Sequence, residues 1–208
     1  MKKLFAITLL TALCFSLTAC GERENSSIAE TDEKTATNET LPEVPEGAIV
    51  DESGTFVYTG PLRQGGDDEN GYIKVPLSYV NFREEGVEGL TQFSNMAGTT
   101  VITLDRYEGY HYELIANNMR YYLSEDENVE GLTGAKVKIN GYNSLQLYCH
   151  YKNDGKYLVA WAIEDPANTE DCYYLAIEFP EDDKSVVACS STFQTIADYA
   201  KSQTASES

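Results

Sequence analysis

The sequence has little basic charge: 15 Lys and Arg residues stand against 34 Asp and Glu residues, for a net charge of -19. A protein that binds nucleic acid needs a basic surface to displace phosphate counterions, so we expect no nucleic-acid partner. Anionic lipid headgroups repel such a chain as well. The excess of acid favours the solubility of an exported protein, and an acidic surface made for a cationic partner is the alternative.

The chain is also poor in residues that build catalytic and metal centres. Its two histidines are His111 and His150. Cys149 directly precedes His150, and on a strand these side chains point to opposite faces, which excludes a Cys–His dyad. There is no C-x-x-C pair and no phosphate-binding glycine loop. The calcium-loop-like segment from Asp126 has Val137 where a bidentate Glu is required. We therefore expect no metal, no cofactor and no enzymatic activity.

The sequence begins with an apolar segment that ends in a cysteine. Two lysines precede a mostly apolar run, and Leu17-Thr18-Ala19-Cys20 closes it. The segment is typical of a secretory signal, and its last four residues resemble the lipobox of bacterial lipoproteins. The resemblance implies cleavage between Ala19 and Cys20 by signal peptidase II and lipid on the Cys20 sulfur. This lipid would hold the protein on the extracytoplasmic face of the cell membrane. A plain signal peptide with an incidental cysteine is the alternative.

Composition divides the chain into four parts. Residues 1–19 form the signal peptide, and residues 20–54 a flexible acidic tether with too little apolar area to fold. Residues 55–200 have the size of one domain, and residues 201–208 form a disordered tail. We predict that the domain is α+β, with a single antiparallel sheet and helices packed on it.

Hydrophobic periodicity predicts the elements of this domain. Strands are expected at residues 55–59, 72–76, 92–95, 99–107, 135–139, 145–152, 157–164 and 172–179. A helix over residues 110–124 carries Ile115, Met119 and Tyr122 on one stripe. A closing helix over residues 183–199 has its buried face at Val186, Cys189, Phe193 and Ile196.

The hairpin formed by strands 145–152 and 157–164 allows a prediction of its register. A three-residue loop with Gly155 in the left-handed conformation would set Cys149 opposite Val159 on one apolar face. Tyr148 and His150 would then lie on the opposite, wetter face. In this register Cys149 could meet Cys189 of the closing helix in a disulfide. We favour the other state, in which all three cysteines of the domain, an odd number, are free.

Short patterns also recur along residues 55–200 in a recognisable order. Tyr72-Ile-Lys-Val-Pro76 is followed by Tyr79-Val-Asn-Phe82, then by Gln92–Asn95 and Thr99–Leu104, and Ser191–Phe193 lies in the closing helix. This order resembles the PsbP-like proteins, although that family often has Trp where this chain has Tyr79. The resemblance implies an α/β/α sandwich. It implies no shared activity and transfers no functional residue, because members of the family bind different partners.

Tyrosine is abundant, with 15 Tyr against seven Phe and one Trp. Tyr supplies a flat apolar ring with a polar tip, which suits sugar and protein surfaces, although half-buried strand positions favour it too. Tyr107, Tyr110, His111 and Tyr112 gather between a strand and a helix and form our predicted contact patch.

These patterns together predict a lipid-anchored extracytoplasmic binding or assembly module without catalytic activity. Its expected partners are the membrane, through the lipid on Cys20, and an envelope protein or ligand. One alternative is a hydrolase of envelope glycan or peptide that uses carboxylates. Another is a lipoprotein that binds a small ligand or a metal.

Overall fold

The computed structural model describes residues 48–50, 56–82 and 89–206. The signal peptide, Cys20 and most of the predicted tether lie outside these residues. The elements follow one another as β1 (Ala48–Val50), β2 (Phe56–Tyr58), β3 (Leu62–Asp67), β4 (Gly71–Pro76), β5 (Val80–Phe82), β6 (Thr91–Ser94), β7 (Val101–Tyr107), α2 (Tyr112–Glu125), β8 (Val129–Ile139), β9 (Tyr142–Tyr151), β10 (Lys156–Glu164), β11 (Cys172–Pro180), η2 (Glu181–Thr192) and α3 (Ile196–Ser206).

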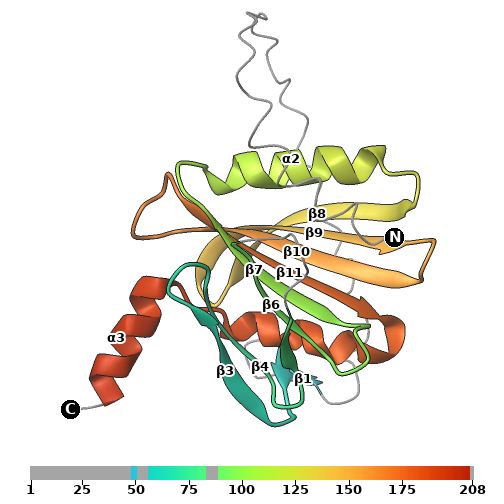
Figure 1. The fold of residues 1–208 in the computed structure, drawn as a ribbon. Coiled ribbons are helices and arrows are strands. Elements are labelled where there is room, and N and C mark those ends of the chain that lie inside the picture. Colours follow the sequence, from blue (N-terminus) through green and yellow to red (C-terminus); the bar gives the residue numbers. More distant parts are fainter. Residues whose placement is uncertain (1–47, 51–55, 83–88, 207–208) are drawn as a thin grey trace, which may run out of the picture. The chain divides into compact units, whose positions relative to one another are not determined.

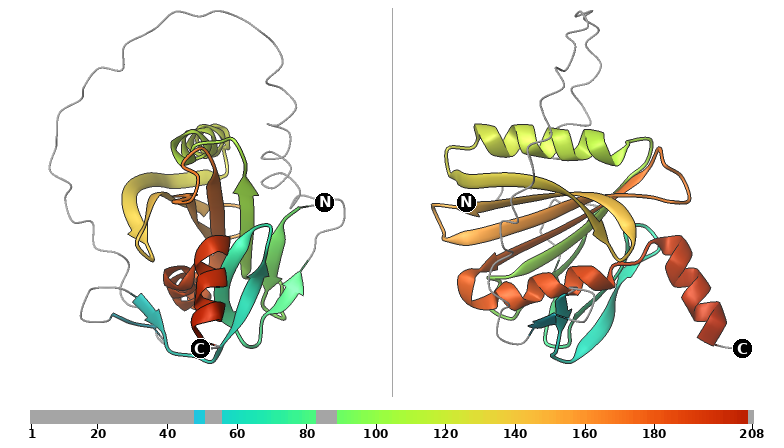
Figure 2. Two further views of the ribbon diagram at one scale, coloured as in Figure 1. Left: turned by 90° about the vertical axis from the view of Figure 1, so that its left-hand side faces the viewer. Right: turned by 180° about the vertical axis from the view of Figure 1, so that it is seen from behind.

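A seven-stranded antiparallel sheet forms the centre of the domain (Figure 1). Its strand order is β5-β6-β7-β11-β10-β9-β8. β1 pairs with β2, and β3 pairs with β4, in two separate two-stranded ribbons. Helix α2 covers one face of the sheet, while η2, a run of 3₁₀ turns, and the β3–β4 ribbon lie on the other side (Figure 2). The predicted α+β class, a sheet between helices, is confirmed.

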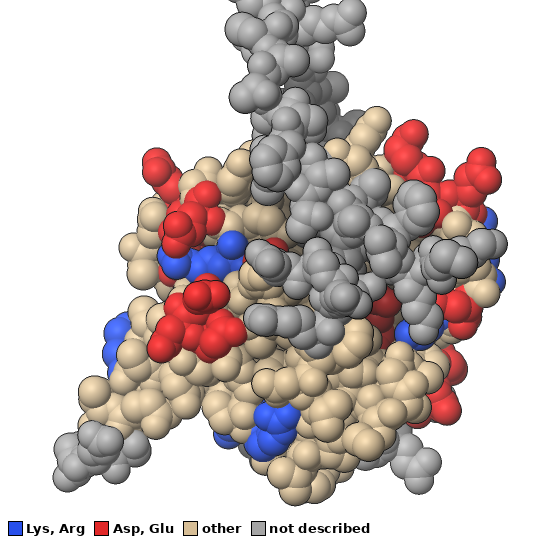
Figure 3. Space-filling model, viewed as in Figure 1, with Lys and Arg blue, Asp and Glu red and all other residues tan. Residues whose placement is uncertain are grey.

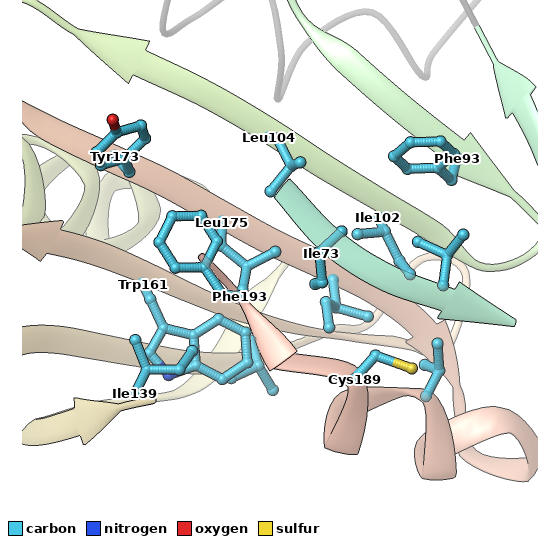
Figure 4. Close-up of a cluster of buried hydrophobic side chains, with 14 of the residues drawn as sticks. Ile73, Phe93, Ile102, Leu104, Ile139, Trp161, Tyr173, Leu175, Cys189 and Phe193 are labelled. Atoms are coloured by element: carbon cyan, nitrogen blue, oxygen red, sulfur yellow. The ribbon is translucent and has the colours of Figure 1, made fainter. Parts of the chain in front are cut away.

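The main core lies between the sheet and η2 (Figure 4). Alternate residues of the central strands point into it, because successive side chains of a strand face opposite sides. Ile177 of β11, for example, lies between Ile102 of β7 and Val159 of β10. The fully or nearly fully buried members of this cluster include Ile73, Val75, Phe93, Ile102, Leu104, Ile139, Trp161, Ile163, Tyr173, Leu175, Val186, Cys189 and Phe193.

A second apolar layer lies under α2. The helix buries Ile115, Ala116 and Met119, so the predicted stripe is confirmed at Ile115 and Met119, while Tyr122 is half-buried. The central strand β10 is buried at six of its nine positions, all consecutive, because helices cover both faces. A strand covered on both faces reads as a continuous apolar run and not as an alternating one.

This two-sided burial explains why the predicted hairpin register is wrong by one residue. Cys149 lies opposite Leu158, and Tyr148 lies opposite Val159. The turn therefore holds four residues, 152–155, with Gly155 in the predicted left-handed conformation at φ 69°. Apolar side chains occupy both faces of β10, so matching one apolar face to another could not select the register.

Several predicted boundaries also differ from the structure. β1 falls inside the predicted tether, and α3 runs to Ser206, into the predicted disordered tail. The predicted closing helix is broken into η2 and α3. Between them, the amide of Gln194 donates to the Tyr72 carbonyl at 2.8 Å and its carbonyl accepts from the Tyr72 amide at 3.0 Å. This pairing to β4 holds the chain extended and stops the helix. β3 and β5 have no counterpart among the predicted strands.

Candidate binding site

The predicted contact patch forms two pairs of rings in the structure. Tyr107 is half-buried at the end of β7, with its ring edge-on to Tyr174 at 6.5 Å. His111 and Tyr112 form the second pair, with ring centroids 4.6 Å apart at the start of α2. The exposed His111 caps this helix, because its Nδ1 accepts from the Glu113 amide at 3.3 Å. Tyr110, half-buried, lies in the loop between the two pairs.

Beside Tyr107 lies a carboxyl group with a perturbed proton affinity. Burial raises the pKa of Asp105 to about 6, although hydrogen bonds from the Tyr107 side chain and the Arg106 amide lower it in part. Burial likewise raises the pKa of the Tyr107 hydroxyl, and the nearby Asp105 raises it further. A carboxyl group with such a pKa can be a functional group or the consequence of packing. The hydrogen bonds that Asp105 accepts come from the Tyr107 side chain and the Arg106 amide, at 2.8 Å for the latter.

Arg106 belongs to an ion-pair network on the other face of β7. Its guanidinium donates to Asp171 at 2.8 Å and lies 3.5 Å from Asp165. It also sits 5.5 Å from the centre of the Tyr173 ring. Both carboxylates are buried, and Asp171 also accepts from the Gly109 amide at 2.7 Å. Buried charges need such partners. We therefore infer that the network stabilises the loop between β10 and β11, which contains both aspartates.

The disulfide considered between Cys149 and Cys189 is not formed. Cys189 is a member of the core between η2 and the sheet, whereas Cys149 pairs with Leu158 and points to the α2 side. The sheet separates the two thiols. Cys149, Cys172 and Cys189 are all free and buried, and burial raises the pKa of each thiol to about 12.

Three aromatic rings stand side by side on neighbouring strands of the η2-facing side of the sheet. Phe179 of β11, Tyr157 of β10 and Tyr148 of β9 are stacked, with centroids 5.8 Å and 5.9 Å apart and both interplanar angles 23°. We call these three residues the aromatic row. Its inner ring, Phe179, is buried, whereas both tyrosines are half-buried. The row therefore leads from the core to the surface.

The outer end of the aromatic row is open toward β8. Thr133 is the cross-strand partner of Tyr148, and Ala135 is the partner of Gln146 two residues away. Thr133 and Ala135 are both small and exposed. Within the described residues, no ring of β8 continues the stack. A planar group placed over Thr133 and Ala135 would meet the ring of Tyr148 as the next member of the row.

Polar groups surround this open end. Nδ1 of His150 lies 2.8 Å from a carboxylate oxygen of Glu130, and the His150 ring lies 4.7 Å from that of Tyr157. The Tyr157 hydroxyl is hydrogen-bonded to Glu181, which raises the pKa of Tyr157. Glu181 also accepts from Lys184 at 2.8 Å, and this bond lowers the pKa of Glu181. The site thus combines aromatic faces with donors and acceptors at its rim, as binding sites do.

The aromatic row was not predicted from the sequence because the predicted register was wrong. That register placed Tyr148 and His150 on the face opposite to Tyr157, although the three residues share one face. The pairing of Tyr148 with Val159 and of His150 with Tyr157 settles this. The abundance of tyrosine was the one signal in the sequence that pointed toward such a surface.

Charge and composition restrict what else the described surface can offer. In the part of the chain that the structure describes, no group of three or more His, Cys, Asp or Glu is placed to hold a metal ion. No helix among these residues is both long and apolar enough to cross a membrane. On the face seen in Figure 3, acidic side chains gather in several patches with few basic ones between them.

Comparison with known proteins gives structural matches only. No family model matches the chain, and no curated protein matches it. Solved structures that resemble it include the PsbP protein (CyanoP) of Synechocystis sp. PCC 6803, at 12% identity and a TM-score of 0.47, with 64% of this chain and 92% of that chain covered.

Two further matches are more distant. A Bacteroides thetaiotaomicron protein has 15% identity and a TM-score of 0.41, over 65% of this chain and 48% of that chain. A protein of unknown function from Pseudomonas aeruginosa has 13% identity and a TM-score of 0.32, over 60% and 86% of the two chains. The fold class stated above rests on the strand order and helices of this chain itself.

Proposed function

We propose that the protein is a lipid-anchored, extracytoplasmic binding module that holds an envelope partner at the open end of the aromatic row. The observation that carries the proposal is a stack of three rings that leads out of the core and stops at two small exposed residues of β8. Tyr is among the residues most enriched where proteins meet their partners. A ring that is half-buried before binding loses little side-chain freedom when a partner covers it.

The polar rim supports binding of a group with hydrogen-bonding capacity. Glu130, His150 and Glu181 are held by neighbours, so they are oriented before a partner arrives. Groups that are already oriented lose less entropy on binding, which favours affinity. The module acts without catalytic chemistry in this proposal.

The anchor of the proposed module is lipid on Cys20. The lipobox-like residues 17–20 support it, and the acidic composition of the segment that follows supports a spacer. Several acyl chains together hold a protein on a membrane firmly, at ~0.8 kcal/mol per buried methylene. Cys20→Ala should therefore move the protein from the membrane fraction to the soluble fraction, with unchanged circular dichroism. Membrane retention of this variant would contradict the anchor.

Photo-crosslinking tests the binding site. A photoreactive amino acid in place of Ala135, in the full chain in its native membrane, should give one specific crosslinked product. Tyr148→Ala in the same chain should reduce that product strongly. Tyr121→Ala, which removes an exposed tyrosine of α2 that is 60% accessible, should leave it unchanged. Equal crosslinking in all three proteins would overturn the proposed site. Turnover of envelope glycan or peptide that one Asp or Glu substitution abolishes would overturn the non-catalytic function.

A further inference from the structure

We infer that the partner contributes an extended segment that pairs with the free edge of β8 and alternates acidic with aromatic side chains. The inference rests on the proposed function, since it names the class of partner that the open end of the aromatic row receives. It follows from three properties of β8: its position, the side chains of its two faces and the charge of the molecule.

β8 is the last strand of the sheet on its side. It is 11 residues long, and only β9 is paired with it among the described strands. Its register with β9 shifts between Glu130 and Thr133 and is then regular from Thr133 to Ile139. Bulges and lysines commonly protect such edges from unwanted pairing. Here the bulge bends only the start of the strand, so within the seven regular residues every second residue keeps its backbone donor and acceptor for a partner strand.

The α2-facing side of this edge is basic. Lys136 pairs with Leu145 and Lys138 with Asn143, so both lysines lie on the same face of the sheet. The Lys136 side chain is 81% exposed, and its Nζ is 3.7 Å from Glu113. Opposite charges on adjacent strands attract each other. A strand added beside β8 would therefore be favoured if it placed acidic side chains next to these lysines.

The other face of the same edge has space for a bulky ring. Thr133 and Ala135 leave the outer side of Tyr148 uncovered, as described above. A side chain on an added strand would lie next to these two small residues, about 5 Å from β8. An aromatic ring there could reach across them and stack on Tyr148. Because side chains alternate along a strand, the lysines and the open row together require alternating acidic and aromatic residues.

Two other occupants of the edge fit less well. In a symmetric pairing of β8 with a second copy, Lys136 and Lys138 would face lysines or Gly134, with no acid between residues 134 and 138 on that face. Like charges directly opposite each other are destabilising. Residues 21–47, between the predicted anchor and β1, are acidic but contain no aromatic residue. An acidic partner can approach despite the net charge of -19, because charges more than about 8 Å apart are largely screened at physiological salt.

Two blocked heptapeptides test the inference on the full chain in detergent. One alternates Tyr with Glu, and the other alternates Tyr with Lys. The Tyr/Glu peptide should bind about tenfold more tightly, since two attractive cross-strand pairs replace two repulsive ones. It should also slow hydrogen exchange of the residue 133–139 amides that point away from β9. A Tyr/Glu peptide with proline at its centre should lose binding, because proline lacks the amide hydrogen.

Matched variants separate the parts of the inference. Lys136→Glu combined with Lys138→Glu should reverse the preference, so that the Tyr/Lys peptide binds more tightly. Tyr148→Ala should weaken both peptides, and Tyr121→Ala should weaken neither. An unchanged preference in the charge-reversed variant, or no slowing of exchange at residues 133–139, would overturn the inference. Slow exchange of these amides without peptide would also overturn the inference. Protection that does not depend on protein concentration would show that the chain's own segment covers the edge. Protection that increases with protein concentration would show that a second copy covers it.

The outcomes also distinguish the inference from the proposed function. If crosslinking from position 135 depends on Tyr148 while neither peptide affects β8, the partner is not a strand and only the inference fails. If crosslinking is independent of Tyr148, the proposed function itself fails.

Discussion

Asp105 gives the sharpest quantitative prediction of the structure. Its carboxyl group lies half-buried on β7, accepts a hydrogen bond from Tyr107 and has a pKa raised from 3.8 to about 6, chiefly by burial. Asp105→Asn keeps the size of the side chain and an oxygen that can accept from Tyr107, but it cannot ionise. The variant should therefore be more stable than the wild type, and only at a pH where the carboxyl group of the unfolded wild-type chain is charged.

The sign and size of the effect follow from proton linkage. Between pH 3.8 and about 6 the folded protein holds a proton at Asp105 that the unfolded chain has released. Stability falls with rising pH wherever the folded state binds more protons. The loss is absent below pH 3.8, grows through this window and is complete above about pH 6. One pKa unit corresponds to ~1.4 kcal/mol, so the full loss is about 3 kcal/mol.

Urea unfolding followed by circular dichroism at pH 3.5 and pH 7.5 measures this difference. Asp105→Asn and wild type should have similar free energies of unfolding at pH 3.5, whereas the variant should gain up to about 3 kcal/mol at pH 7.5. Glu127→Gln removes an exposed acid and should show no such pH dependence. An advantage of Asp105→Asn that is the same at both pH values would refute the reasoning, because the gain would then come from packing and not from ionisation.

Three further predictions concern stability and reactivity. Phe193→Ala should cost about 4 kcal/mol in urea unfolding, since the ring is fully buried, whereas Tyr121→Ala on the outside of α2 should change little. Arg106→Met should cost about 3–5 kcal/mol, because it leaves two buried carboxylates without a partner charge, while the exposed Arg120→Met should be nearly neutral. A thiol reagent at pH 8 should leave the three described cysteines unmodified in the folded protein, and it should modify all three in urea. If unreduced, unfolded protein had one free thiol or none, the cysteines would not be free.

The elements of the domain were largely predictable from local patterns, whereas their junctions were not. The stripe of α2 and the buried residues of η2 follow from helical periodicity, so Met119, Val186 and Cys189 were placed correctly. The break after Thr192 depends on the pairing of Gln194 with Tyr72, more than a hundred residues away. Contacts this distant in sequence leave no local signal. The same is true of β3. The sequence Gly65-Gly66 is typical of a loop, and only the pairing of these residues with β4 shows that they belong to a strand.

The candidate site was harder to predict because it depends on register. Periodicity shows which residues of β9 share a face, but not which residues of β10 lie opposite them when both faces are apolar. Because helices cover both sides of the sheet, the two faces of β10 do not differ in polarity. Such a difference would otherwise have indicated the correct register. A slip of one residue is enough to turn Tyr148 away from Tyr157. The aromatic row therefore becomes visible only when both helical layers are in place.

The composition of the aromatic row argues for a role beyond filling the core. Its residues change from Phe179, which is buried, to Tyr157 and Tyr148, which are half-buried, so a hydroxyl appears where the row reaches water. If the row served packing alone, a larger apolar residue on β8 would cover Tyr148 and add about 25 cal/mol for each Å² buried. The chain instead has Thr133 beside it. This leaves the outer ring uncovered at a strand edge with which no other described strand pairs. Our inference is that one partner segment covers the ring and pairs with the edge.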